Sequence, residues 1–196
     1  KAEELSVDST GELKEKFLNL SKDFYHISGK KPVTFKQALY LVWFIYLLSD
    51  PDSFGRFDWY LYPFFKNDME SGRINSETAL ELLEGFWIRI EEANAIQNMT
   101  IGGMDAEGNP FYNELTMLCL LATDEMRFKG PNLCMRINDK MPGVYWEAIM
   151  KCLGTGQGLP ALYNDSVIVN YLITLNISLE DARNYALAGC SQVNIP

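Results

Sequence analysis

Apolar residues recur at helical spacing through the first half of the chain, between stretches of polar and charged residues. The first stripe consists of Leu13, Phe17, Leu20 and Phe24. Spacings of three and four residues bring such side chains to one face of a helix. Residues 38–48 are almost continuously apolar. This run is too short to cross a bilayer, so it predicts a buried helix and no membrane span. We therefore expect residues 1–95 to be mainly helical.

Short strand-like runs alternate with helical runs over residues 96–196. Residues 133–137 alternate in polarity, with Cys134 and Arg136 on one side and the apolar residues on the other, as in a strand. A second, buried strand is predicted over residues 159–163. Helical patterns occupy residues 113–127, 144–153, 165–175 and 178–186. This alternation predicts an α/β architecture with a partly parallel sheet or barrel.

The chain as a whole, residues 1–196, is interpreted as a fragment of one larger domain. A change of composition near residue 96 is the best candidate for an internal boundary. The predicted strands are short and few, and a sheet that lacks strands exposes unpaired backbone groups along its edges. We therefore expect these strands to be completed by chain outside residues 1–196.

The composition excludes several classes of protein. The formal net charge of −9 argues against a nucleic-acid partner, because phosphate binding requires clustered Lys and Arg. The chain has four cysteines, without a C-x-x-C pair, and one histidine, so neither a metal site nor a disulfide framework is expected. The polar start, residues 1–11, carries no signal-peptide pattern. Reduced thiols in the cytoplasm fit these features best.

Cys190 has the most suggestive surroundings of the cysteines. It follows Gly189 and precedes a polar pair in a predicted loop, a position that can be both tight and accessible. A nucleophilic cysteine needs a base, and the histidine, His26, is distant in the sequence. From the residues alone, a packed inert thiol and a functional thiol both stay open, and packing is favoured. The other cysteines are interpreted as packing residues: Cys119, Cys134 and Cys152.

Two further motifs receive structural interpretations. The glycine-rich residues 154–158 follow a predicted helix and precede a strand, the reverse of the order in a phosphate-binding loop. A helix C-cap is expected there instead. Asp165 follows Asn164 directly before a predicted helix, so we expect it to cap the helix N-terminus. No pair of carboxylates is spaced for acid–base catalysis.

Several motifs, taken in order, are more informative than any single residue. They are Gly55-Arg56-Phe57-Asp58, Tyr60-Leu61-Tyr62-Pro63, Asn98-Met99-Thr100-Ile101-Gly102-Gly103-Met104-Asp105, Pro131-Asn132-Leu133 with Arg136, Gly158-Leu159-Pro160-Ala161-Leu162-Tyr163-Asn164-Asp165, and Glu180-Asp181-Ala182-Arg183 with Tyr185-Ala186 and Gly189-Cys190. Their shared order and spacing over residues 54–196 resemble the glycyl radical enzymes of the pyruvate formate-lyase type. The first fifty residues resemble this family only in being helical.

The resemblance implies a ten-stranded α/β barrel built from two antiparallel halves, of which this chain is an internal fragment. It implies that Cys190 lies at the tip of a loop inside the barrel and forms the thiyl radical. That radical would cleave a C–C, C–O or C–N bond of a small organic substrate. An Arg-Val-x-Gly-Tyr type stretch for the glycyl radical is absent from the sequence, so the radical belongs on a segment outside this chain. A further implied partner is an iron–sulfur activating enzyme that uses S-adenosylmethionine, and a homodimer is expected.

The residues beside Cys190 depart from the patterns of the known family members. Dehydratases of the family resemble one another in a Gly-Cys-Val-Glu-Pro stretch, with the Glu as base, whereas this chain has Gln192 at that place. An amide cannot accept the proton, but it can orient a substrate. Gly189 replaces the first cysteine of the Cys-Cys pair of pyruvate formate-lyase. Gln192 is therefore a predicted substrate contact. Arg136 is a second predicted contact because its strand is expected to present it to the barrel interior. The resemblance specifies the family but not the reaction.

A non-catalytic role is the alternative hypothesis. A truncated or split remnant of a glycyl radical enzyme would also lack the glycyl radical stretch. Such a remnant would act as a binding or structural piece.

Overall fold

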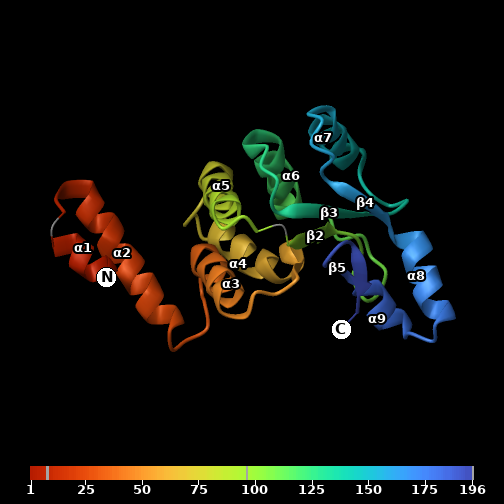
Figure 1. Cartoon of the computed structure of the whole chain (residues 1–196), viewed down its shortest axis with the longest axis horizontal. Helices are drawn as coiled ribbons and strands as arrows, with labels where there is room; N and C mark the ends of the chain where they lie inside the picture. The colour runs from red at the N-terminus through yellow and green to blue at the C-terminus, as the bar shows by residue number, and fades with distance from the viewer. Residues whose placement is uncertain (8, 96, 196) are drawn as a thin grey trace. The chain divides into compact units, whose positions relative to one another are not determined.

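The first part of the chain is built from helices. The computed structural model describes residues 1–7, 9–95 and 97–195, and these form two units, Lys1–Ser49 and Asp50–Pro196. The first unit contains α1 (Ala2–Val7), α2 (Gly11–Ile27) and α3 (Phe35–Ser49), and α2 contacts both of its neighbours (Figure 1). In the described part of the chain, no helix has the length and apolar character needed to cross a membrane.

The second unit alternates strands and helices. Its elements in chain order are β1 (Ser53–Arg56), α4 (Phe57–Glu70), α5 (Ser76–Glu92), β2 (Asn98–Gly102), α6 (Glu114–Met126), β3 (Asn132–Ile137), α7 (Gly143–Gly154), β4 (Ala161–Asn164), α8 (Asp165–Thr174), α9 (Leu179–Arg183), β5 (Ala186–Ala188) and β6 (Gln192–Asn194). Most of these elements match the predicted runs, and α7 ends at the glycine-rich residues as expected.

A parallel sheet organises the second unit. Among the described residues it has four strands in the order β1-β2-β3-β4, each parallel to its neighbour. Met99 pairs with Leu133, and Met135 pairs with Leu162. Sequential parallel strands require a crossover between each pair, and the helices α4 to α7 provide these connections. The α/β architecture with a parallel sheet predicted from the sequence is confirmed.

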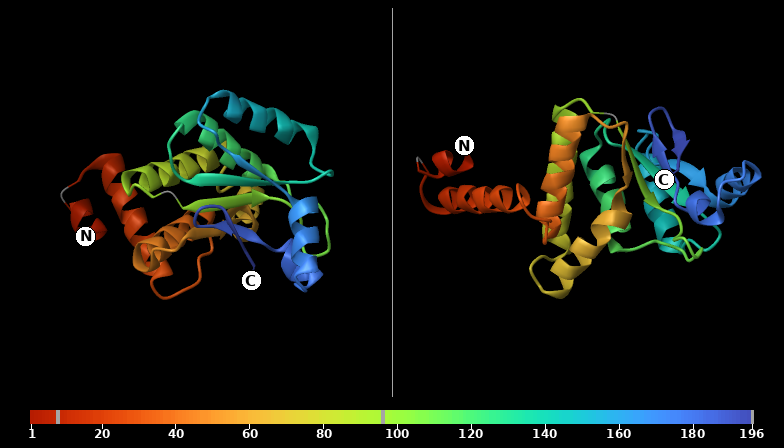
Figure 2. Two further views of the ribbon diagram at one scale, coloured as in Figure 1. Left: turned by 45° about the vertical axis from the view of Figure 1, so that its right-hand side comes forward. Right: turned by 90° about the horizontal axis from the view of Figure 1, so that it is seen from below.

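The two faces of this sheet have different partners. Cys134 packs in a cluster with Ala182, Tyr185 and Leu187, which precede or belong to β5. Because side chains alternate along a strand, Leu133 and Met135 point to the other face. Figure 2 shows α5, α6 and α7 over one face and the β5–β6 hairpin against the opposite face. The predicted division of residues 133–137 into two sides is therefore confirmed.

Three details were not indicated by the sequence. Residues 53–56 form β1 within residues 1–95, whose other described elements are helices. The helix predicted over residues 178–186 ends at Arg183, and the chain then enters β5. The two units divide after Ser49 rather than near residue 96, and residue 96 itself lies outside the described residues. Strand β1 pairs with the distant β2, and β5 is bonded by side chains of both strands, which a local pattern does not report.

Candidate functional site

The site is built around a short hairpin that carries Cys190. Strands β5 and β6 are antiparallel, with Ala186 opposite Asn194 and Ala188 opposite Gln192. The connecting turn contains Gly189 at φ +50°, a conformation that glycine adopts at little cost. Cys190 lies at the tip of this turn and is exposed. The loop-tip position predicted for Cys190 is therefore present, although the barrel around it is not part of the described structure.

Side chains of β1 and β2 fasten the hairpin to the sheet. The backbone N–H of Leu187 donates to Thr100 Oγ1 at 2.9 Å, and Ser53 Oγ donates to the carbonyl oxygen of Leu187 at 2.5 Å. Asn98 Nδ2 donates to the carbonyl oxygen of Gly189. Asn98 and Thr100 are fully buried. Buried hydrogen bonds of this kind resist displacement because a broken one leaves an unsatisfied polar group, so the turn holding Cys190 has a fixed base.

Asn98 connects the hairpin to the next strand. Its side-chain oxygen accepts hydrogen bonds from Asn132 Nδ2 and from the thiol of Cys134, whose Sγ lies 3.3 Å away. Burial raises the pKa of Cys134 to about 12. Because the thiolate is the reactive form, Cys134 is an inert packing thiol, as the sequence predicted.

Arg136 occupies a buried network behind the hairpin. Its Nε donates to Asp165 Oδ1 at 2.8 Å, Nη1 donates to the carbonyl oxygen of Tyr185 at 2.9 Å, and Nη2 donates to that of Arg183 at 2.8 Å. The guanidinium carbon lies 3.9 Å from the centre of the Tyr185 ring. Arg136 and Asp165 are fully buried. Arg136 was expected to contact substrate, but in the structure its three nitrogens hold the segment that leads into β5.

Asp165 also differs from its predicted role. Asn164, one residue earlier, caps α8 by accepting hydrogen bonds from the backbone of Ser166 and Val167. The Asp165 carboxylate instead accepts from Arg136 and, at 2.8 Å, from the hydroxyl of Tyr185. The expected N-cap was wrong by one residue because either Asn or Asp satisfies the capping pattern. Asp165, and not Asn164, points into the protein because its carboxylate pairs with Arg136, which lies 29 residues away in the sequence.

A glycine is required where β2 ends against this network. Gly103 has φ +94°, and a Cβ built on it would lie 2.6 Å from Arg136 Nε. No side chain fits at that distance, so the close approach of the backbone to the guanidinium needs glycine here.

Gln192 lies near the tip of the hairpin and is exposed. It pairs with Ala188 across the two strands, and its Oε1 lies 3.6 Å from the position that a Cβ on Gly189 would occupy. The hairpin thus brings Gln192 to the same turn as Cys190. Arg136 lies in a separate, buried position, so the structure unites two of the three predicted site residues.

A buried carboxyl, Asp58, stabilises the loop between β2 and α6. Its Oδ2 accepts from the backbone N–H of Gly102 at 2.8 Å and from Thr116 Oγ1 at 2.6 Å, whereas Oδ1 has no partner. Complete burial raises the pKa of Asp58 to about 6, against opposing hydrogen bonds from Thr116 and Gly102. The sequence analysis named this residue in a motif without assigning it a role.

The raised pKa of Asp58 predicts a pH-dependent stability. An unfolded carboxyl ionises near 3.8, so the folded state binds the proton more tightly than the unfolded state does. The resulting stabilisation is present below pH 4 and is lost as the pH rises through 6. The shift corresponds to about 3 kcal/mol. Urea unfolding from pH 4 to 7.5 should show the wild type losing about 2.4 kcal/mol more than Asp58→Asn, whose amide retains an acceptor, because the unfolded carboxyl is already partly ionised at pH 4. A pH-independent difference between the two proteins would contradict this assignment.

Comparison with known proteins places these features in a family. A family model described as "Pyruvate formate lyase-like" matches residues 1–196. The chain is 30% identical to (2S)-3-sulfopropanediol dehydratase of Klebsiella oxytoca, over 93% of this chain and 25% of that protein. It is also 30% identical to the 4-hydroxyphenylacetate decarboxylase glycyl radical subunit of Clostridioides difficile (strain CD196), over 96% of this chain and 24% of that protein.

A solved structure agrees with the computed fold. The crystal structure of a glycyl radical enzyme from Archaeoglobus fulgidus superposes with a TM-score of 0.91 at 33% identity, over 98% of this chain and 28% of that one. The chain therefore spans about a quarter of the length of the curated relatives that it matches.

Proposed function

Because the chain belongs to the pyruvate formate lyase-like family, we propose that the intact protein is a glycyl radical enzyme and that Cys190 is its thiyl radical residue. The observation that carries this proposal is the position of Cys190. It is exposed at the tip of a hairpin whose base is fixed to β1 and β2. A residue that transfers hydrogen atoms must reach its reaction partners without moving far, and an anchored turn provides that geometry.

The proposed chemistry requires little else from this chain. A glycyl radical on another part of the protein supplies the unpaired electron. Cys190 Sγ gives up its hydrogen atom, becomes a thiyl radical and takes a hydrogen atom from a C–H bond of the substrate. After the bond cleavage, Cys190 returns a hydrogen atom to the product. This cycle needs no base beside the sulfur, which explains how an exposed cysteine without a histidine partner can be functional.

The proposed activity also requires parts of the protein outside this chain and a partner enzyme. We propose that a ten-stranded barrel surrounds the hairpin in the intact protein and keeps water away from the radical. An iron–sulfur activating enzyme that uses S-adenosylmethionine would form the glycyl radical. We place the protein in the cytoplasm, as a homodimer, with a small organic molecule as substrate.

Gln192 bears on which type of reaction the enzyme catalyses. Its amide is exposed beside the turn, where it can donate and accept hydrogen bonds but cannot remove a proton. We expect it to orient the substrate. Because a positioned general base contributes roughly 10²- to 10⁴-fold to a rate, an elimination that depends on a carboxylate at this place should be slow in the wild type.

The reaction class can be identified with a panel of substrates. The activated intact protein is incubated anaerobically with a diol, an amino alcohol, a 2-keto acid or an arylacetate, and the products are analysed. We expect conversion of one class and little dehydration of the diol. Gln192→Glu should raise diol dehydration by at least about tenfold, whereas the control Gln157→Glu, on the loop after α7, should not.

Two outcomes would count against the proposal. Efficient dehydration of the diol by the wild type would refute the role assigned to Gln192. Failure of the intact protein to acquire a glycyl radical from an activating enzyme would favour the non-catalytic alternative.

A further inference from the structure

A second buried arginine, Arg56, lies at the end of β1 and forms no ion pair with any carboxylate of the described residues. Its side chain is 6% exposed. Nη1 donates to Asn184 Oδ1 at 3.0 Å and Nη2 donates to the carbonyl oxygen of Met104 at 2.8 Å, while Nε has no partner. A guanidinium has five N–H donors, so three of them are unused. Within the described residues, no carboxylate lies within ion-pair distance of Arg56, in contrast to the pairing of Arg136 with Asp165.

A buried charge without a counter-ion is unusual. Transfer of an ion from water into the protein costs several kcal/mol unless an opposite charge compensates it. Burial and then the positive charge of Arg136 lower the pKa of Arg56 to about 10, and the negative charges of Asp58 and Asp165 oppose this only in part. The side chain is therefore charged at neutral pH, and neither carboxylate is within ion-pair distance of it. The stacking of its guanidinium carbon on Trp59, 4.6 Å from the ring centre, offers partial compensation.

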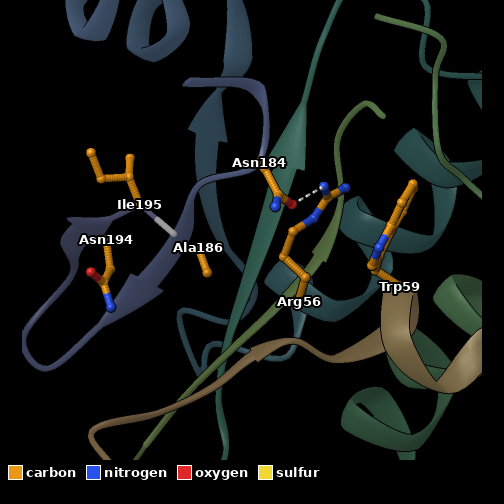
Figure 3. A pocket seen from close by; sticks show the side chains of 6 residues that line it. All are labelled: Arg56, Trp59, Asn184, Ala186, Asn194 and Ile195. Carbon is orange, nitrogen blue, oxygen red and sulfur yellow. Dashed lines mark hydrogen bonds between the residues drawn. The ribbon is translucent and has the colours of Figure 1, made fainter. Parts of the chain in front are cut away.

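A cavity of about 300 Å³ opens beside this side chain, a volume at the lower end of the range for ligand sites. Its lining consists of Arg56, Trp59, Asn184, Ala186, Asn194 and Ile195. Figure 3 shows Arg56 standing between Trp59 and Asn184, with the hairpin residues beyond Asn184. The lining thus offers a cation, two amides, one aromatic ring and two aliphatic side chains, which together fit a small organic anion.

We propose that this cavity binds the carboxylate group of a small organic molecule, with Arg56 as its counter-ion. The planar guanidinium matches the two oxygens of a carboxylate and forms two parallel hydrogen bonds with them. Asn184 and Asn194 add amide groups, and the remaining lining residues cover the organic part of the ligand.

This site is separate from the proposed radical centre. Ala186 and Asn194 form the open end of the hairpin, whereas Cys190 lies at its tip. At ~3.3 Å per strand residue, the two ends lie on the order of 10 Å apart. A substrate of two or three carbons cannot reach both, so the carboxylate site is not the position of the reacting carbon. A bound carboxylate would instead lie at the open end of the hairpin, beside Ala186 and Asn194.

Acetate is the probe for this site. Its binding to the intact, unactivated protein is measured by saturation-transfer NMR and by the rise of the thermal midpoint, at constant ionic strength set with chloride. A ligand that binds the native state raises this midpoint as its concentration exceeds its Kd. We expect saturable binding to the wild type and to Arg89→Met, an exposed control on α5, and at least a tenfold weaker affinity in Arg56→Met.

A second variant separates binding from folding. Ala186→Leu keeps the guanidinium and fills the cavity, so it should also lose acetate binding even where Arg56→Met unfolds. Equal acetate affinity in the wild type and Ala186→Leu would overturn the proposal. The absence of saturable acetate binding to the wild type would also overturn it. That result is expected if a carboxylate side chain elsewhere in the longer protein already pairs with Arg56. Neither result bears on Cys190, because no radical is needed for this measurement.

Discussion

Replacing Cys190 by alanine should reduce product formation by the activated intact protein by about a thousandfold or more. Removing a residue that forms the reactive intermediate typically costs this much or more in kcat. The substitution is expected to leave the fold intact, because Cys190 is exposed and the hydrogen bonds that hold the hairpin come from Ser53, Asn98 and Thr100. The measurement is turnover per glycyl radical, with the radical counted by electron paramagnetic resonance.

The matched control for this substitution is another cysteine of the same unit. Cys152→Ala removes a buried thiol whose pKa burial raises to about 11. Cys152 is part of α7, on the face of the sheet opposite the hairpin. Turnover per radical should stay within a few-fold of the wild type in this variant. If Cys190→Ala retained a tenth or more of the wild-type turnover, the thiyl assignment would be wrong.

Replacing Arg136 by methionine should lower the free energy of unfolding by about 3–5 kcal/mol, the range found when one partner of a buried ion pair is removed. Two effects combine. Asp165 would be left buried without its charged partner, and the carbonyl oxygens of Arg183 and Tyr185 would lose their donors. Urea unfolding of the intact, unactivated protein measures the difference, with the exposed Arg89→Met as a control expected to stay near zero.

A double variant tests whether the charge is the cause. Arg136→Met combined with Asp165→Leu removes both charges and should recover part of the loss, because a buried ion pair can be replaced by apolar residues at little cost. A loss below about 1 kcal/mol for Arg136→Met alone would indicate that water reaches Asp165. A double variant no more stable than the single variant would show that the lost hydrogen bonds to the two carbonyls, and not the unpaired charge of Asp165, cause the loss.

The sheet and its helices were predictable from local patterns. The alternation over residues 133–137 indicated β3 and the division of its side chains, because a strand that packs on two different layers carries two kinds of residue. The helices α6, α7 and α8 carry apolar residues at helical spacing and begin or end at recognisable residues, such as the glycines after α7. These features depend on neighbours in the sequence.

The hairpin at Cys190 was not predictable in this way. Strands β5 and β6 are three residues each, too short to carry a pattern. Their stability comes from Ser53, Asn98 and Thr100, which lie 87 to 134 residues away in the sequence. The neighbouring residues predicted only a loop around Cys190, and the resemblance to the family implied its place at the tip of that loop.

The partners of the buried charges escaped the sequence analysis for a related reason. Arg136 was assigned to the substrate because its strand face was known but its distant partners were not. Arg56 and Asp58 were noted as parts of a motif without a role. Only the assembled fold shows that the Arg136 charge is paired with Asp165 and that Asp58 is held by hydrogen bonds. It also shows that, among the described residues, the Nε of Arg56 has no hydrogen-bond partner.

Hydrogen exchange at the radical itself tests the role of Cys190 most directly. The thiol hydrogen of Cys190 exchanges with solvent, whereas the C–H hydrogen of a glycine does not. If Cys190 gives its hydrogen atom to the glycyl radical, activated intact protein in D₂O should acquire deuterium at that glycine. The hydrogen splitting of its paramagnetic resonance signal should then collapse, and Cys190→Ala should retain the splitting. A collapse that is equally fast in Cys190→Ala, or no collapse in the wild type, would contradict the account.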